Sequence, residues 1–300
     1  MTNQKTISGR AWIELMLLGL IWGGSFLSVR IALEEVQVMT AVLHRTFWAM
    51  LVLWGVVLLM RQRIPRDPRV WGGFLVMGLL NNVIPFCLMS WGQLHIETGL
   101  TSILNATTAI FGVIVAAIVF ADERLTLRKA IGVGVGFLGV ATAIGLGSLA
   151  SFDLRSTAQI AVLLGTVSYA CAGSWARARL GHLSPQVAAA GMLTCSTAVM
   201  LPVALIVDGP LTLDLQPATV MAIAYYALIA TAGAYLLYYR VLIRAGSGNL
   251  MLVTLLIPPV AILLGAAILD EALHPKAYAG FVLLALGLLI LNGTIGKRRN

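Results

Sequence analysis

Charged residues are scarce in this chain of 300 residues: only 11% are charged, whereas 59% are apolar. A soluble domain carries charge on roughly a quarter of its residues, so this composition cannot cover a surface exposed to water. The net charge of +8 is not arranged as a basic stripe with interleaved aromatics, which argues against a nucleic-acid partner. The composition therefore indicates an all-α integral membrane protein whose surroundings are the lipid bilayer.

Cysteine and histidine are also rare, with three and four residues. The cysteines lie inside apolar stretches, without metal-ligand spacing or the pattern of a disulfide framework. The histidines lie near the ends of apolar stretches, and no Gly-x-Ser-x-Gly or His-Glu-x-x-His motif occurs. Metal binding and nucleophilic catalysis need clustered ligands or a nucleophile beside a base. We therefore expect that the protein binds no metal or cofactor and is not an enzyme. A channel is an alternative, although no charged ring or filter motif is visible.

Long apolar stretches dominate the chain. A helix needs about 20 apolar residues to cross a bilayer, because lipid cannot hydrogen-bond an open backbone. The first two stretches contain a few charges, the other eight contain none, and the connecting segments are short. We predict ten transmembrane helices, over residues 11–33, 40–60, 70–94, 98–121, 130–152, 156–176, 183–207, 215–239, 245–269 and 277–296.

Basic residues alternate between the two sides of these spans. If the N-terminus is cytoplasmic, 16 of the 20 Lys and Arg residues fall in cytoplasmic segments. Most acidic residues then fall outside. Since Lys and Arg favour the cytoplasmic side, the pattern predicts N-in, C-in topology for a multi-pass membrane protein.

The second half of the chain repeats the first. A shift of 148 residues places Asp122 to Leu125 (DERL) on Asp270 to Leu273 (DEAL), and a shift of 147 places Arg30 on Arg177. Two halves rich in leucine and glycine could also align by chance. Charged residues and glycines coincide, however, so we interpret the match as a true internal repeat.

The repeat divides the chain into residues 1–148 and 149–300, each with five predicted spans. Because five is odd, the second half must enter the membrane from the opposite face. Inverted repeats give two nearly equivalent packings, one open to each side, which is the basis of alternating access. The parity therefore favours a carrier.

Several motifs carry a family resemblance. Trp22 to Phe26 (WGGSF) lies in the first span, and Arg45 lies in the second. Glu123 and Glu271 are each followed by glycines at the same spacing in the two halves. The chain resembles the drug/metabolite transporter superfamily, specifically its EamA-type ten-helix members. It departs from many of them at Asp122 and Asp270, where they have glycine. Within the family it looks most like bacterial inner-membrane amino-acid exporters.

The resemblance implies a monomeric exporter of amino acids, aromatic and other neutral ones included. An exporter of drug-like cations or of another metabolite is the alternative within the superfamily.

Polar, proline and aromatic residues at mid-depth are candidates for the transport pathway, because polar groups inside a membrane are costly. Most buried Asn, Ser and Thr only bond one helix to another, and that alternative applies to each residue alone. Proline frees a backbone carbonyl for a ligand, and a double proline is expected to interrupt the ninth span. The predicted substrate-binding residues are Trp22, Ser25, Asn81, Asn82, Pro85, Asn105, Tyr169, Thr231, Tyr235, Thr254 and Pro258.

No carboxylate lies near mid-membrane in the sequence. Glu14 is about one turn inside the first span, where we expect an interfacial role at the helix end. Arg45 could bind a substrate carboxylate, but a local pair with Glu34 or Glu35 is favoured. Without a buried proton carrier, we expect a facilitator or exchanger. The glycines of the fifth and tenth spans suit close helix contact, as scaffold.

Overall fold

The computed structural model describes residues 7–96, 98–145, 153, 156–211, 214–268 and 275–292, leaving aside the side chains of 98, 99, 264–268 and 292. Within these ranges the chain is helical and contains no strand. Segments labelled η are π-helical. The elements are α1 (Gly9–Ala32), α2 (Val38–Leu59), α3 (Pro68–Gly78), η1 (Leu79–Val83), α4 (Ile84–Gln93), α5 (Thr98–Ala106), α6 (Thr108–Val119), α7 (Leu127–Ile144), α9 (Thr157–Trp175), η2 (Ala176–Leu180), α10 (Pro185–Val207), α11 (Pro217–Ala224), η3 (Tyr225–Gly233), α12 (Ala234–Ala245), α13 (Ser247–Met251), α14 (Val253–Ile268) and α15 (Pro275–Asn292).

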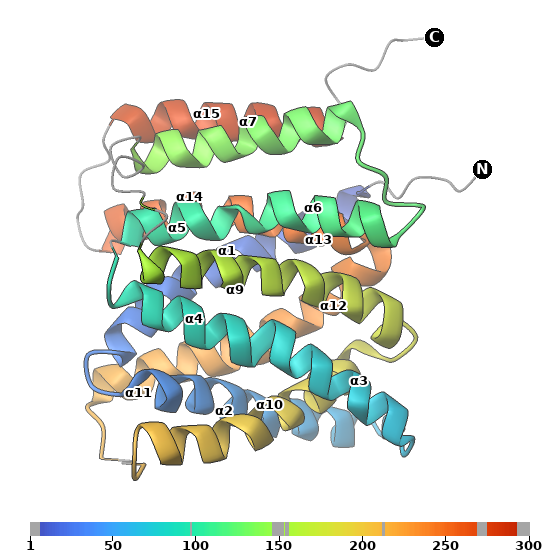
Figure 1. Cartoon of the computed structure of the whole chain (residues 1–300), viewed down its shortest axis with the longest axis vertical. Coiled ribbons are helices and arrows are strands. Elements are labelled where there is room, and N and C mark those ends of the chain that lie inside the picture. The colour runs from blue at the N-terminus through green and yellow to red at the C-terminus, as the bar shows by residue number, and fades with distance from the viewer. Residues whose placement is uncertain are drawn as a thin grey trace.

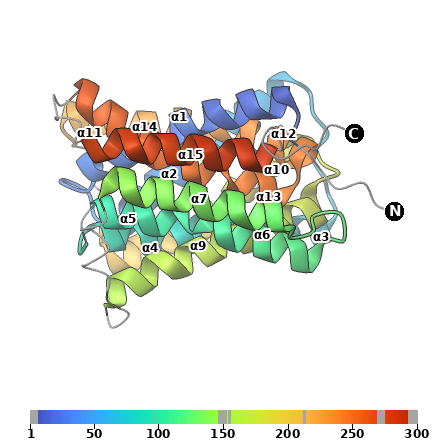
Figure 2. The ribbon, with the colours of Figure 1, turned by 90° about the horizontal axis from the view of Figure 1, so that it is seen from above.

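These elements join into the ten predicted spans. Among the described residues, eight continuous helical segments are long and apolar enough to cross a membrane, and two shorter apolar ones cover Ser247–Leu263 and Pro275–Leu291. All ten spans are thus confirmed as helices. Because ten is even, α1 begins and α15 ends on the same side of the bundle, which we call the terminal face (Figure 2). The other side is the opposite face.

The surface of the bundle is apolar along the helices. Leu59 and Ile206 are 85% and 82% exposed, and Ile118 is 79% exposed. A water-soluble protein rarely shows so continuous an apolar surface. Lipid tails accept such a surface, because a helix bonds its backbone groups within its own segment.

The helices form layers along the long axis of the molecule. Figure 1 shows α7 and α15 side by side at one end, and α2 and α10 packed together at the other. Between these pairs lie α1 against α14 and α4 against α9. The fifth spans of the two halves are therefore partners at one end, and the second spans are partners at the other.

Glycines bring α7 and α15 into backbone contact. A Cβ on Gly139 would lie 2.8 Å from the Gly280 carbonyl oxygen, and one on Gly287 would lie 2.8 Å from the Gly132 carbonyl oxygen. Only residues without a side chain permit this approach. The predicted close contact of these glycines is confirmed, and we call the contact the glycine seam.

The double proline does not interrupt its helix, so that prediction is wrong. Pro258 and Pro259 lie inside the continuous α14, and the break in the ninth span comes earlier, at Leu252 between α13 and α14. A membrane helix tolerates proline when neighbouring helices and local adjustments satisfy the freed backbone groups.

Candidate functional site

A cavity of about 90 Å³ lies between the two halves of the bundle. A water needs roughly 10–15 Å³ by the same measure, so the space holds on the order of six to nine waters, enough for a small organic molecule. Its lining comes from spans 1, 2, 3, 4, 6, 8 and 9 and is mostly apolar and aromatic. The residues are Trp22, Ser25, Phe26, Val29, Arg45, Asn81, Phe86, Met89, Ser90, Gln93, Asn105, Thr108, Tyr169, Tyr235, Tyr238, Met251, Val253, Thr254 and Ile257.

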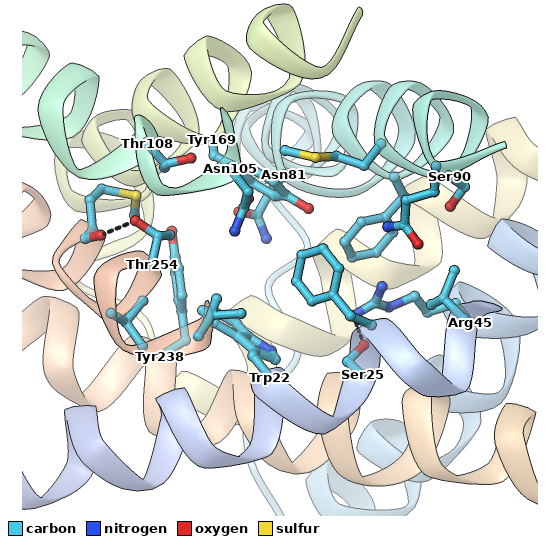
Figure 3. Close-up of a pocket in the computed structure, with 18 of the residues that line it drawn as sticks. Trp22, Ser25, Arg45, Asn81, Ser90, Asn105, Thr108, Tyr169, Tyr238 and Thr254 are labelled. Carbon is cyan, nitrogen blue, oxygen red and sulfur yellow. Dashed lines mark hydrogen bonds between the residues drawn. The ribbon is translucent and has the colours of Figure 1, made fainter. Parts of the chain in front are cut away.

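The cavity extends from the middle of the bundle toward the opposite face. Val29 and Gln93 line it near the ends of α1 and α4, which end at that face. Tyr238 and Met251 line it on the side nearer the terminal face. Figure 3 shows Asn81, Asn105 and Tyr169 on one wall, with Trp22 and Tyr238 across from them.

Seven of the eleven predicted residues line this cavity, and four do not. Asn82, Pro85, Thr231 and Pro258 are buried beside it. Pro85 packs against Gly165 of α9, and Pro258 is enclosed within α14. The seven that do line it are Trp22, Ser25, Asn81, Asn105, Tyr169, Tyr235 and Thr254.

Asn82 supports the cavity wall from behind. Its amide donates to the Ser196 hydroxyl at 2.8 Å, and its carbonyl accepts from the Tyr235 hydroxyl. The Tyr235 hydroxyl also accepts from the Asn81 amide at 3.0 Å. Asn81 and Asn82 belong to η1, and such π-helical turns are common at functional sites.

We expect Asn82→Ala to change the stability of the protein and Asn105→Ala to change its transport kinetics. Asn82 is fully buried, so its removal deprives Tyr235 of an acceptor and should destabilise the protein by about 2 kcal/mol. Asn105 forms no side-chain hydrogen bond with any other described residue, so Asn105→Ala should leave stability unchanged and raise the KM of transport. Thermal unfolding in detergent and counterflow kinetics check the pair. An unstable Asn105→Ala protein would contradict this division.

Arg45 lies in the cavity and not on the loop acids, so the favoured pairing with Glu34 or Glu35 is wrong. Its Nε donates to the Thr231 hydroxyl at 2.9 Å, and Nη2 donates to the Ser25 hydroxyl at 3.3 Å. The Glu35 carboxylate accepts instead from the Gln216 backbone at 3.1 and 3.2 Å. Thr231 is fully buried, so its hydroxyl does not face the cavity but holds the Arg45 side chain that does.

The π-helical segments provide carbonyl groups for contacts between helices. The Trp22 indole N–H donates to the Ala230 carbonyl in η3 at 2.8 Å, and the Ser168 hydroxyl donates to the Leu80 carbonyl in η1 at 2.7 Å. The first bond fixes the indole that forms one wall of the cavity, and also ties α1 to the eighth span.

Most of the other residues that line the cavity were not predicted from the sequence, because they are apolar or lie near the end of a span. Phe86, Met89, Ser90 and Gln93 all line the cavity, and they recur at spacings of three and four, the signature of one helix face. That spacing could have identified them. Nothing in the pattern distinguishes Val29 or Ile257 from ordinary packing residues.

The terminal face is closed by a group of charged and hydrogen-bonded contacts that we call the latch: Asp122, Glu123, Arg177, Ser247 and Gly248. Arg177 pairs with both carboxylates. Glu123 is buried and also accepts from the Ser247 and Gly248 backbone amides, each at 2.8 Å. The latch joins the first half of the chain to two spans of the second half.

The turn next to the latch requires glycine. Gly246 has a φ of 87°, and a Cβ there would lie 2.6 Å from Glu123 Oε1. A side chain at this position would therefore be strained and would displace the carboxylate from Ser247.

A second ion pair closes the same face. Glu14 Oε1 accepts from Arg244 at 2.6 Å, and Arg240 lies 3.8 Å away. Glu14 thus joins α1 to α12 outside the cavity, in agreement with its expected role near a helix end.

On the opposite face, the polar contacts between the described parts of the two halves are hydrogen bonds. The Asp208 carboxylate accepts from the Thr40 amide at 2.7 Å and from its hydroxyl at 2.9 Å, which caps the start of α2. Residues 270 and 271, the repeat counterparts of Asp122 and Glu123, lie outside the described residues.

Comparisons with known proteins agree on the kind of molecule. The model of the EamA-like transporter family matches residues 10–145 and again residues 156–293. A solved crystal structure superposes with a TM-score of 0.76 at 15% identity, covering 97% of this chain and 99% of the other. At that identity the likeness concerns the fold alone.

Three relatives match over nearly their whole length. An Archaeoglobus fulgidus protein named "Uncharacterized transporter" is 24% identical, covering 94% of this chain and 98% of its own. An Escherichia coli protein named "Probable amino-acid metabolite efflux pump" is 23% identical, covering 95% of both chains. A Streptantibioticus cattleyicolor protein named "Probable terminal-alkyne amino-acid exporter" is 26% identical, covering 98% of this chain and 97% of its own.

Proposed function

Because this chain belongs to the EamA-like transporter family, we propose that it exports neutral amino acids, aromatic ones included, from a bacterial cell. The proposal places it in the inner membrane as a monomer, with both termini in the cytoplasm. Two relatives carry names that refer to the efflux or export of amino acids or their metabolites, which supports this substrate class.

The cavity is the observation that carries the proposal. It combines a cationic side chain, neutral amides and a wall of aromatic rings. A zwitterion with an apolar side chain needs those three environments: a partner for the carboxylate, acceptors for the ammonium and an apolar wall. Trp22 and Tyr238, whose ring centroids are 6.3 Å apart, supply the wall.

The charge of the cavity disfavours drug-like cations as substrates. Arg45 is the one charged residue among the described residues that line it, and a cation would meet this guanidinium without a compensating carboxylate. The same lining supports a facilitator or exchanger, since it offers no carboxylate to carry a proton.

The arrangement of the two halves supports alternating access. The latch closes the terminal face, whereas the cavity extends toward the opposite face. In the proposed cycle, residues 1–148 and 149–300 rearrange so that the latch opens and the opposite face closes around the same cavity.

Counterflow in proteoliposomes tests the proposal. Vesicles loaded with an unlabelled amino acid should transiently accumulate the labelled one. This counterflow should saturate with concentration, and a channel does not show it. The panel includes phenylalanine, leucine and alanine. Absence of counterflow for every amino acid would refute the substrate class.

Coupling is tested in the same vesicles. An imposed pH gradient should not drive accumulation above the equilibrium level, because no described lining residue is a carboxylate. Concentrative uptake driven by the gradient would contradict the facilitator or exchanger mechanism and leave the substrate class standing.

A further inference from the structure

Arg45 is held in the cavity entirely by neutral groups. Its hydrogen-bond acceptors are the hydroxyls of Thr231 and Ser25, and its guanidinium carbon lies 4.0 Å from the centroid of the Phe86 ring. No carboxylate of the described residues lies within the 4.0 Å that defines an ion pair. The guanidinium is therefore a positive charge within the bundle that has no ion-pair partner among the residues described.

The unused N–H groups of Arg45 form a binding edge. A guanidinium has five N–H donors, and the protein uses one on Nε and one on Nη2. Both donors on Nη1 and the second on Nη2 are left. One N–H from each terminal nitrogen forms the parallel pair that binds a carboxylate in a bidentate manner. Figure 3 shows the guanidinium beside Ser25 at one end of the cavity.

The rest of the lining offers an ammonium group only neutral acceptors. Asn81 donates its amide N–H to Tyr235, which leaves the Asn81 carbonyl oxygen as an acceptor, and Asn105 contributes a second amide. Figure 3 shows both amides on the wall across from Trp22. An ammonium gains charge-assisted hydrogen bonds from these acceptors but no opposite charge, whereas a carboxylate at Arg45 gains both an opposite charge and a bidentate pair of hydrogen bonds. The two ends of an amino acid are therefore recognised unequally.

We infer that Arg45 binds the carboxylate of the substrate, and that the site accepts small apolar monocarboxylates whether or not they carry an α-amino group. This inference rests on the proposed function in taking the cavity as the transport site. It extends the substrate class to des-amino acids and excludes the corresponding amines.

Binding to the purified protein in detergent, measured by calorimetry, tests the inference with three related compounds. Phenylalanine has both groups, 3-phenylpropionate lacks the amine, and 2-phenylethylamine lacks the carboxylate. Loss of a hydrogen bond between the ammonium and a neutral acceptor should weaken 3-phenylpropionate binding by about tenfold, the lower end for a hydrogen bond that involves a charged group. Loss of the charge pair should weaken 2-phenylethylamine binding by about 100-fold or more.

Variants of Arg45 separate binding from a structural role. Arg45→Gln should weaken the binding of phenylalanine and of 3-phenylpropionate by about 100-fold. Arg45→Lys keeps the charge but not the planar fork, so its affinities should lie between those of Arg45→Gln and those of the unaltered protein. Thr231→Val removes a neutral partner and keeps the guanidinium, so affinity should fall only several-fold. Arg63→Gln, which removes an exposed charge in the loop after α2, is the matched control and should bind like the unaltered protein.

The outcomes distinguish this inference from the proposed function. Equal binding of 2-phenylethylamine and 3-phenylpropionate, unaltered affinity in Arg45→Gln, or no binding of either carboxylate would overturn the inference. Phenylalanine counterflow that persists in Arg45→Gln would overturn it and leave the proposed function intact. Binding of 3-phenylpropionate together with a complete absence of amino-acid counterflow would instead refute the proposed function and support the inference.

Discussion

Glu123→Ala should shift the protein toward the conformation that is open at the terminal face. Glu123 is 1% exposed, and its loss leaves two backbone amides without their acceptor and Arg177 with Asp122 as its remaining partner. Breaking a buried ion pair by removing one partner costs about 3–5 kcal/mol. Because the latch belongs to the conformation described here, that cost falls on this conformation, and the equilibrium should move by more than roughly a hundredfold.

Labelling from each side of the membrane measures this shift. Thr254→Cys places a thiol in the cavity, in a background where Cys87, Cys171 and Cys195 are replaced by serine. An impermeant maleimide should reach the thiol from the opposite face in the parent, and from the terminal face once Glu123→Ala is added. Glu34→Ala, which removes an exposed carboxylate at the opposite face, is the control and should change neither rate.

A second variant guards against simple unfolding. Arg177→Gln breaks the same pair from the other side, so it should shift labelling in the same direction. The double variant should shift it little further, because two residues of one ion pair are not additive. Unchanged labelling in both single variants would contradict the role of the latch.

Gly280→Ala should destabilise the whole bundle. The added Cβ would lie 2.5 Å from both the Ala143 Cβ and the Gly139 carbonyl oxygen. The obstacle includes backbone, which a change of rotamer cannot move, so α15 must separate from α7. We expect a loss of about 3 kcal/mol, the upper end for overpacking, measured as a lower unfolding temperature in detergent.

The same helix pair offers a matched control. Gly134 lies in α7, and a Cβ there would meet nothing within 4 Å. Gly134→Ala makes an identical chemical change and should not lower stability, since alanine is the better helix former. If both variants lost stability equally, helix propensity or insertion would explain the loss and the glycine seam would not.

The number of helices was predictable because the bilayer imposes a length on each apolar run. The seam was predictable for a related reason: glycines at matched positions of a repeat have few other uses in lipid. The effect of Pro258 and Pro259 was not, because proline only removes one hydrogen bond, and the neighbouring helices decide whether the helix continues.

The site was predictable in composition but not in geometry. Asn81 and Asn105, chosen as polar residues at mid-depth, line the cavity, yet Asn82, adjacent in sequence, points to Ser196 and Tyr235 because consecutive side chains of a helix face different directions. Arg45 appeared closer to the loop acids in sequence than to Thr231, which is 186 residues away. The alignment of the two halves singled out Asp122, Glu123 and Arg177 as charged residues at matching positions. That they pair with one another depends on how the spans pack, which the sequence does not show.

The glycine seam also bears on how the chain is made. The ribosome completes α7 long before α15, so the bare backbone face of Gly132 and Gly139 has no permanent neighbour while the next four spans are inserted. Only when Gly280 and Gly287 have emerged can that face find the backbone against which it packs. A chain that ends before α15 thus leaves the glycine face of α7 without the helix that packs against it, and the last helix to be synthesised completes the assembly of the first half.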